Sequence, residues 1–100
     1  MALTERFEND KIEVFGQYKA VQVRRATVIE RDGVELTRSF HRHVLDPGTL
    51  GESDTLVDTD ISEEDADVQA ICNAVWTDAV KEAWRVKLVN DAVSAGIATA

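Results

Sequence analysis

The segment Arg31-Asp32-Gly33-Val34 decides the fold, because Asp-Gly between two alternating runs of apolar residues is a strong hairpin signal. A two-residue type I′ turn needs positive φ at both central positions, which Asp and Gly tolerate. Arg31 then lies opposite Val34, and Ile29 lies opposite Leu36. Further outward the predicted pairs are Thr27 with Arg38, Arg25 with Phe40, Val23 with Arg42 and Val21 with Val44. Opposite residues share a face, so the hairpin is predicted to have one face rich in branched and aromatic side chains and one polar face.

A second reversal precedes this hairpin. Gly16-Gln17 suits a two-residue loop of type II′, which has Gly first. Pairing outward places Val14 opposite Lys19 and Ile12 opposite Val21, on the apolar face. The sequence therefore predicts a three-stranded antiparallel meander with strands near 10–15, 18–31 and 34–45, the middle strand being central.

The C-terminal third has a helical pattern. Ser62 is a good N-cap, and the acidic residues after it suit the positive end of a helix dipole. One apolar row advances four residues at a time: Val68, Cys72, Trp76, Val80, Trp84 and Leu88. Each step of four turns the row by about 40°, so one straight helix cannot keep the row against one flat sheet. We therefore expect either a bent helix or two helices, near 62–76 and 78–94, with a break at Thr77.

These elements predict one α+β domain over residues 1–100, in which the helical segment covers one face of the meander. Residues 1–9 are expected to be loose, 10–45 to form the meander, 46–61 an acidic loop, 62–94 the helical segment and 95–100 a frayed tail. Asp46-Pro47-Gly48 marks the start of the loop, because Pro has no N–H for the sheet ladder.

The net charge is −8, and the acidic excess lies between Glu52 and Asp67, where there is no Lys or Arg. Such a charge argues against general nucleic-acid binding. Arginines on the apolar sheet face need partners, and the available acids include Glu8, Asp10 and residues 63–67. The predicted ion-pair residues, within the chain or between chains, are Arg25, Arg38, Arg42, Asp65 and Asp67. Anion binding by these arginines is the alternative.

No motif predicts catalysis. His41-x-His43 has a metal-ligand spacing, but no further ligand is in register, and surface histidines are the simpler reading. Asp58-x-Asp60-x-Ser62 resembles the start of a calcium loop, yet Glu63 and Gln69 stand at the two diagnostic positions. Cys72, the only cysteine, is expected to be a small core residue. We expect no enzyme activity, metal, cofactor or small-molecule substrate, and no apolar run reaches membrane-spanning length.

Two tryptophans on the rotating row exceed what one small sheet can cover. Large apolar surface left uncovered usually marks an interface, and Trp is favoured in such anchors. The predicted interface residues are Trp76, Val80, Trp84 and Leu88. They would serve self-association or docking on a larger assembly.

The segments that begin Lys11-Ile-Glu-Val, Ala20-Val-Gln-Val-Arg, Asp32-Gly-Val-Glu and Val68-Gln-Ala-Ile-Cys resemble a group of small, uncharacterised proteins of tailed bacteriophages. These proteins are abundant in marine metagenomes and are often encoded near virion-structure genes. The resemblance covers about residues 10–90 and implies a virion or tail-assembly role, with copies of the chain or other virion proteins as partners. It implies a location in the virion, or in the host cytoplasm during assembly. The alternative is a small acidic binding module, regulatory or inhibitory, that engages a basic protein surface through residues 52–67.

Overall fold

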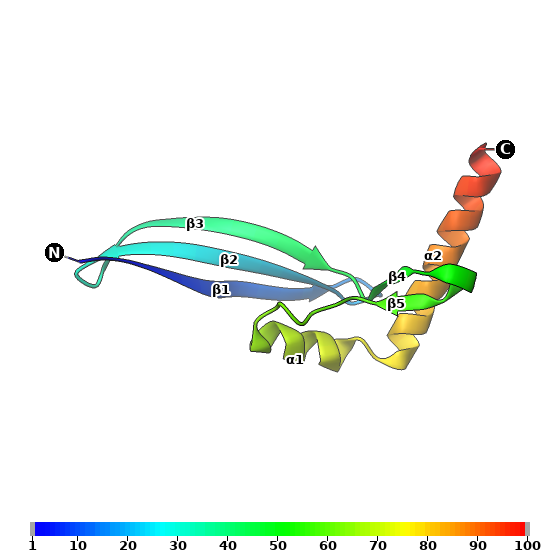
Figure 1. Ribbon diagram of the computed structural model, residues 1–100, viewed down its shortest axis with the longest axis horizontal. Coiled ribbons are helices and arrows are strands. Elements are labelled where there is room, and N and C mark those ends of the chain that lie inside the picture. The colour runs from blue at the N-terminus through cyan, green and yellow to red at the C-terminus, as the bar shows by residue number, and fades with distance from the viewer. Residues whose placement is uncertain (1, 100) are drawn as a thin grey trace.

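Three long antiparallel strands form the body of the molecule, in the order β1-β2-β3 (Figure 1). The computed structural model describes the backbone of residues 2–99 and the side chains of residues 2–94. The strands are β1 (Leu3–Phe15), β2 (Ala20–Arg31) and β3 (Val34–Leu45). A second, two-stranded sheet pairs β4 (Gly48–Leu50) with β5 (Leu56–Asp58) around the 3-10 turn η1 (Glu52–Asp54). The helices are α1 (Ala66–Val75) and α2 (Asp78–Thr99), so the predicted α+β class is confirmed.

The Asp32–Gly33 reversal is confirmed, but the pairing beyond it is shifted. Arg31 lies opposite Val34, and both central residues have positive φ, 52° and 82°. Glu30 then pairs with Glu35 and Ile29 with Thr37, which leaves Leu36 as a bulge without a partner. The predicted Ile29–Leu36 pair is therefore wrong, and so are the pairs beyond it. The observed pairs are Thr27 with Ser39, Arg25 with His41, Val23 with His43 and Val21 with Leu45.

This one-residue shift exchanges the two faces of β3, because side chains alternate along a strand. Arg38 and Arg42 now lie on the face opposite Arg25, since they pair with Val28 and Arg24. Leu36 is 53% exposed rather than covered by a helix. The prediction that all three arginines share one apolar face is therefore wrong.

The first reversal uses four residues, 16–19, rather than the predicted two. Gly16 and Lys19 both have positive φ, and the Lys19 N–H donates to the Gly16 carbonyl at 3.2 Å. Val14 pairs with Val21 and Ile12 with Val23, so the predicted register is wrong by two residues. A shift of two preserves the faces, and Ile12 and Val14 remain on the same side as Val21.

The N-terminal residues belong to the sheet instead of forming a loose end. β1 starts at Leu3, which pairs with Arg31, and contains a bulge at Asp10. The Asp32 N–H donates to the Ala2 carbonyl at 3.2 Å, which ties the start of β1 to the hairpin turn. The pairing with β2 thus extends to the end of the hairpin.

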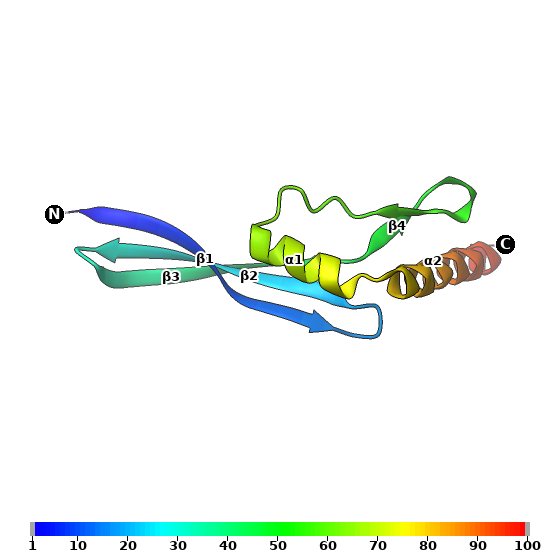
Figure 2. The ribbon, with the colours of Figure 1, turned by 90° about the horizontal axis from the view of Figure 1, so that it is seen from below.

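Helix α1 covers one face of one end of the sheet (Figures 1 and 2). The core is small and consists of Val21, Val23, Val68, Cys72 and Trp76. We call residues 11–15, 20–24 and 41–45, where this core lies, the covered half of the sheet. The remaining strand residues, 3–10, 25–31 and 34–40, form the open half, which has no helix over either face (Figure 2).

The helical segment is broken at Trp76-Thr77. Of the two expected arrangements, the structure therefore has two helices rather than one bent helix. The Thr77 hydroxyl accepts from the Val80 N–H at 3.3 Å at the start of α2. The outer boundaries differ from those predicted, because α1 begins at Ala66 rather than Ser62 and α2 continues to Thr99 rather than ending at residue 94. The expected loop 46–61 contains the β4–β5 pair, which packs against α2.

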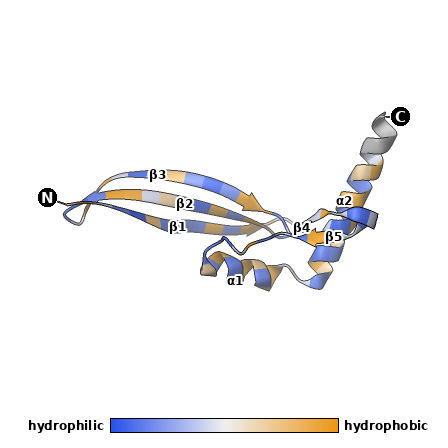
Figure 3. Ribbon diagram, in the orientation of Figure 1, coloured by the Kyte–Doolittle hydropathy of each residue, from blue (hydrophilic) through white to orange (hydrophobic). Residues whose placement is uncertain are grey.

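The molecule is elongated, with extents of 64 × 30 × 22 Å and a radius of gyration of 18.4 Å. A compact chain of this length would have a radius of about 13 Å. Apolar residues are not gathered in one place but recur along the sheet and the helices (Figure 3). The accessible surface is 6645 Å², against about 5,700 Å² expected for a compact protein of this mass.

Candidate interaction surfaces

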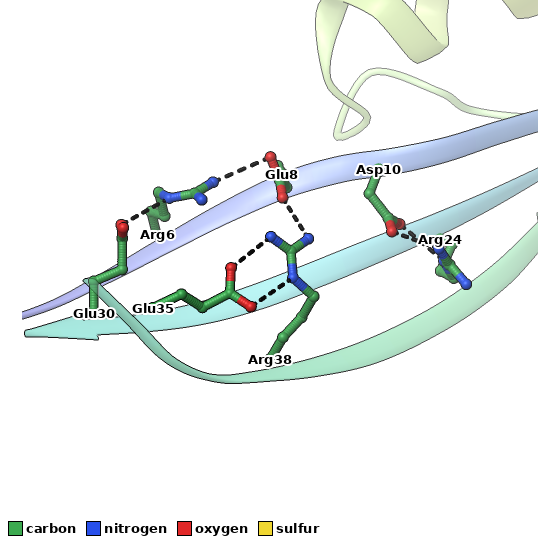
Figure 4. A network of polar contacts seen from close by, with 7 residues as sticks. All are labelled: Arg6, Glu8, Asp10, Arg24, Glu30, Glu35 and Arg38. Atoms are coloured by element: carbon green, nitrogen blue, oxygen red, sulfur yellow. Dashed lines mark hydrogen bonds and ion pairs between the residues drawn. The ribbon is translucent and has the colours of Figure 1, made fainter. Parts of the chain in front are cut away.

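A row of ion pairs crosses the open half on the face opposite α1 (Figure 4). Arg38 from β3 reaches Glu8 of β1 at 2.6 Å and Glu35 of its own strand at 2.8 Å. Arg6 of β1 reaches Glu8 at 3.1 Å and Glu30 of β2 at 2.8 Å. The row therefore joins all three strands, and we call these five residues the ion-pair row.

A second contact on the same face lies beside the β1 bulge. Both terminal oxygens of Asp10 accept hydrogen bonds from Arg24, at 2.9 and 2.6 Å. Such two-point pairing fixes the guanidinium plane. The Arg24 Cζ atom lies 4.3 Å from the centre of the Phe40 ring on β3. The bulge thus directs Asp10 toward β2, and Arg24 in turn toward β3.

These charged side chains cover two apolar residues of the central strand. Ala26 and Val28 are fully buried, although no helix lies over them. Val28 is flanked across the ladder by Arg6 and Arg38, and Ala26 by Glu8 and Phe40. Long charged side chains can cover apolar surface with their methylene groups while the charges stay in water. The ion-pair row is therefore also a lid over the central strand.

Two carboxylates of the ion-pair row, and Asp10 beside it, have pKa values below their ordinary ones. Hydrogen bonds from Arg38 and then Arg6 lower the pKa of Glu8 below its ordinary value. Arg38 likewise lowers the pKa of Glu35, and Arg24 lowers the pKa of Asp10. Burial would raise the pKa of a carboxylate, so the direct hydrogen bonds from arginine cause these shifts.

The predicted ion-pair residues come together only in part. Arg25 and Asp65 approach to 3.9 Å, at the start of α1. Arg38 is paired, but with Glu8 and Glu35 instead of the acids of the helical segment. Asp67 accepts hydrogen bonds from the Val68 N–H and, at 3.4 Å, from Asn9. Within residues 2–94, Arg42 forms no ion pair.

Two contacts that the sequence analysis did not predict fasten the start of α1 to the sheet. The Asn9 amide donates to Asp65 at 2.7 Å, next to the β1 bulge. Glu64 lies 2.9 Å from His43 Nε2, and the His41 ring lies 6.4 Å from that of His43. His43 faces α1 only because of the bulge at Leu36, which alternation alone does not reveal.

The residues of the calcium-like sequence pattern make separate contacts in the structure instead of facing one common point. Asp58 pairs with Lys81 at 3.3 Å, and Asp60 accepts the Ser62 N–H at 2.9 Å. In the part of the chain that the structure describes, no three His, Cys, Asp or Glu side chains are grouped to hold a metal ion. Residues 2–94 also enclose no pocket.

The predicted interface row faces inward rather than outward. Trp76 is 7% exposed, lies in the core and donates its indole N–H to the Lys19 carbonyl at 2.8 Å. Trp84 donates to the Gly48 carbonyl at 2.8 Å and packs its ring 5.3 Å from that of Tyr18. Val80 packs against the core, and Leu88 is half-buried. The prediction that this row is an uncovered surface is wrong, because β4 and β5 supply the second cover that the sequence analysis lacked.

The exposed apolar side chains lie instead mainly on the two outer strands. On β1 and β3 they are Leu3, Phe7, Val14, Phe15, Val34, Leu36, Phe40 and Val44. Both strands also have a free edge, since each pairs only with β2. Val57, Val86 and Val93 are exposed on β5 and α2. Alternation in the sequence marks these residues as strand or helix positions but does not show which face is covered.

Comparisons with known proteins identify no relative: no family model, no curated protein and no solved structure matches this chain. Among the described helices, none is both long enough and apolar enough to cross a membrane.

Proposed function

We propose that this chain is a non-enzymatic structural or assembly protein that associates with other protein chains, either copies of itself or further components. The observation that carries the proposal is the open half of the sheet. Three strands extend well beyond the helix that covers their other end, and both outer edges are free. A sheet built in this way supplies surface for contacts rather than a cavity for chemistry.

The amount of surface supports association. The chain exposes 6645 Å², about 1,000 Å² more than the scaling for compact proteins predicts. A standard interface removes about 800 Å² from each partner. The excess is thus of the size that one contact with another chain would cover, and exposed Phe and Val side chains on β1 and β3 are suited to it.

We further propose, from the sequence resemblance alone, that the assembly is a phage virion or tail. In such an assembly the partners are further copies or neighbouring virion proteins. Identification of the chain in purified virions by mass spectrometry tests this part. Its absence from particles of a phage that encodes it would overturn the virion role while leaving self-association standing.

The test of association is the mass of the full chain in solution. Light scattering after size exclusion, at 1 to 100 μM, should show a mass above the monomer value of 11.1 kDa, rising with concentration. Amide hydrogen exchange of residues 25–31 should slow as the concentration rises. A constant monomer mass at every concentration, with no change in exchange, would refute association between copies.

A second candidate function is supported by the exposed acids before α1. Glu52, Asp60 and Glu63 are exposed, and none forms an ion pair within residues 2–94. Such a surface suits a small regulatory or inhibitory module that binds a basic protein. Reversal of these three charges to Lys should abolish capture of a basic partner if this function is correct. It should leave the oligomeric mass unchanged if association through the sheet or helix is the function.

A further inference from the structure

Over residues 78–94, whose side chains the structure describes, helix α2 has two opposite faces, and only one of them is in contact with the rest of the chain. Trp84 and Lys81 contact Gly48 and Asp58, on the side of β4 and β5. On the other side every side chain is exposed, namely Ala79, Ala83, Val86, Asn90 and Val93. We call these five residues the outer row. Val86 is 42% exposed and Val93 56%.

The spacing of the outer row is that of a coiled-coil seam. Its members are separated by four, three, four and three residues, the alternation of a and d positions in a heptad repeat. Ala83 and Asn90 then occupy a positions, and Ala79, Val86 and Val93 occupy d positions. A single Asn at an a position is a known device that sets register and strand number.

The charges beside the row favour a parallel arrangement. In this frame Glu82 is a g position and Lys87, five residues later, is the next e position. In a parallel pair, Glu82 of one copy and Lys87 of the other lie side by side, twice by symmetry. Within one chain Glu82 pairs with Arg85 and Lys87 with Asp91; the two acidic side chains are exposed and the two basic ones are partly exposed. Exposed pairs contribute little to stability, so exchanging partners costs little.

We propose that a second copy of this chain binds here, with the two α2 helices packed in parallel through the outer row. The inference rests on the proposed self-association and adds to the open half of the sheet a second surface, on α2, through which copies of the chain bind. Figures 1 and 2 show that α2 extends past β4 and β5, so a partner helix can lie along it. Ala79 and Ala83 let the helices approach closely at the start of the seam, and Val86 and Val93 supply its apolar contacts.

A cysteine placed in the seam tests the parallel arrangement directly. In a parallel pair the two copies of residue 86 face each other, within reach of a disulfide. Val86→Cys should therefore form a covalent dimer in high yield under mild oxidation. Val57→Cys is the matched control, because Val57 is 54% exposed but lies on β5, and it should remain monomeric on a denaturing gel. Cys72 is fully buried and should not react in either variant. Equal yields from the two variants would overturn the parallel seam.

Charged substitutions separate this inference from the general proposal. Val86→Glu with Val93→Glu should weaken dimerisation at least tenfold, whereas Val57→Glu should not change it. Asn90→Val should tighten association or raise the number of strands. If the wild type associates and the double variant associates equally well, the seam is wrong but self-association stands. If the wild type is a monomer at 100 μM, both the α2 seam and association between copies fail. Circular dichroism should show unchanged helix content in each variant, because all three positions are exposed.

Discussion

The two halves of the sheet bury similar side chains in different ways. In the covered half Val23 is 1% exposed and lies beneath α1, in contact with a core that includes Cys72 and Trp76. In the open half Val28 is 0% exposed, flanked by Arg6 and Arg38. A helix provides cover that does not depend on charge, whereas the ion-pair row provides cover that depends on ionised partners. Equal burial therefore need not mean equal contribution to stability.

The largest difference between the halves should come from their aromatic residues. Trp76→Ala empties the centre of the core and removes the hydrogen bond to the Lys19 carbonyl. We expect the free energy of unfolding to fall by about 3–5 kcal/mol, measured by urea denaturation. Phe40→Ala is the control in the open half, where the ring is half-exposed, and it should cost less than about 1 kcal/mol. Similar losses in the two variants would contradict a core confined to the covered half.

Matched substitutions in the central strand compare the two kinds of cover. Val23→Ala should lower the free energy of unfolding by about 1–3 kcal/mol, since helix and sheet cannot close the space left behind. Val28→Ala should cost less, because the flexible arms of Arg6 and Arg38 can settle into the space. Both variants are compared by chemical denaturation. The free energy of unfolding should have the same slope against denaturant concentration in each. A larger loss for Val28→Ala would show that the ion-pair row is the more rigid cover.

Amide exchange along β2 tests the comparison without any substitution. Residues 22–24 and 26–30 are in the same strand and have ladder partners on both sides. Local opening is easier where fewer apolar contacts hold the strand. We therefore expect exchange to be at least tenfold faster in the open half, about 1.4 kcal/mol in opening free energy, in dilute monomer by mass spectrometry. Uniform protection along β2 would mean that the sheet opens as one unit.

The smallest expected effect is the pH dependence of the open half. The pKa values of Glu8, Asp10 and Glu35 are lowered in the folded chain, from ordinary values of 4.5, 3.8 and 4.5. These carboxylates therefore contribute fully to stability when the pH is above their ordinary pKa values. The contribution is lost as the pH falls through the lowered pKa values of the folded chain. Glu8→Gln should lower Tm by a few degrees at pH 7, and the gap to the wild type should narrow toward pH 3. A gap that stays constant with pH would show that Glu8 acts by packing alone.

The class and the order of the three long strands and two helices could be read from the sequence, whereas β4 and β5 could not. Positive φ at Asp32 and Gly33, the break at Thr77 and the helical spacing from Val68 onward are local properties, so short stretches of chain specify them. The location of the candidate site could not be read in the same way. The outer strands were expected to share one apolar face, and Trp84 was expected to lack cover.

The register of β3 shows most clearly what depends on tertiary structure. Its apolar residues at 34, 36, 40 and 44 share one parity, and alternation alone places them with Val21 and Val23. The bulge at Leu36 instead places Leu45 against the core and Arg38 against Glu8. Those contacts join residues far apart in the sequence, so their free energy is absent from any local pattern. Local chemistry thus determined the hairpin turn at Asp32–Gly33, the three long strands and the two helices, and long-range contacts decided which faces are covered and which remain free to bind.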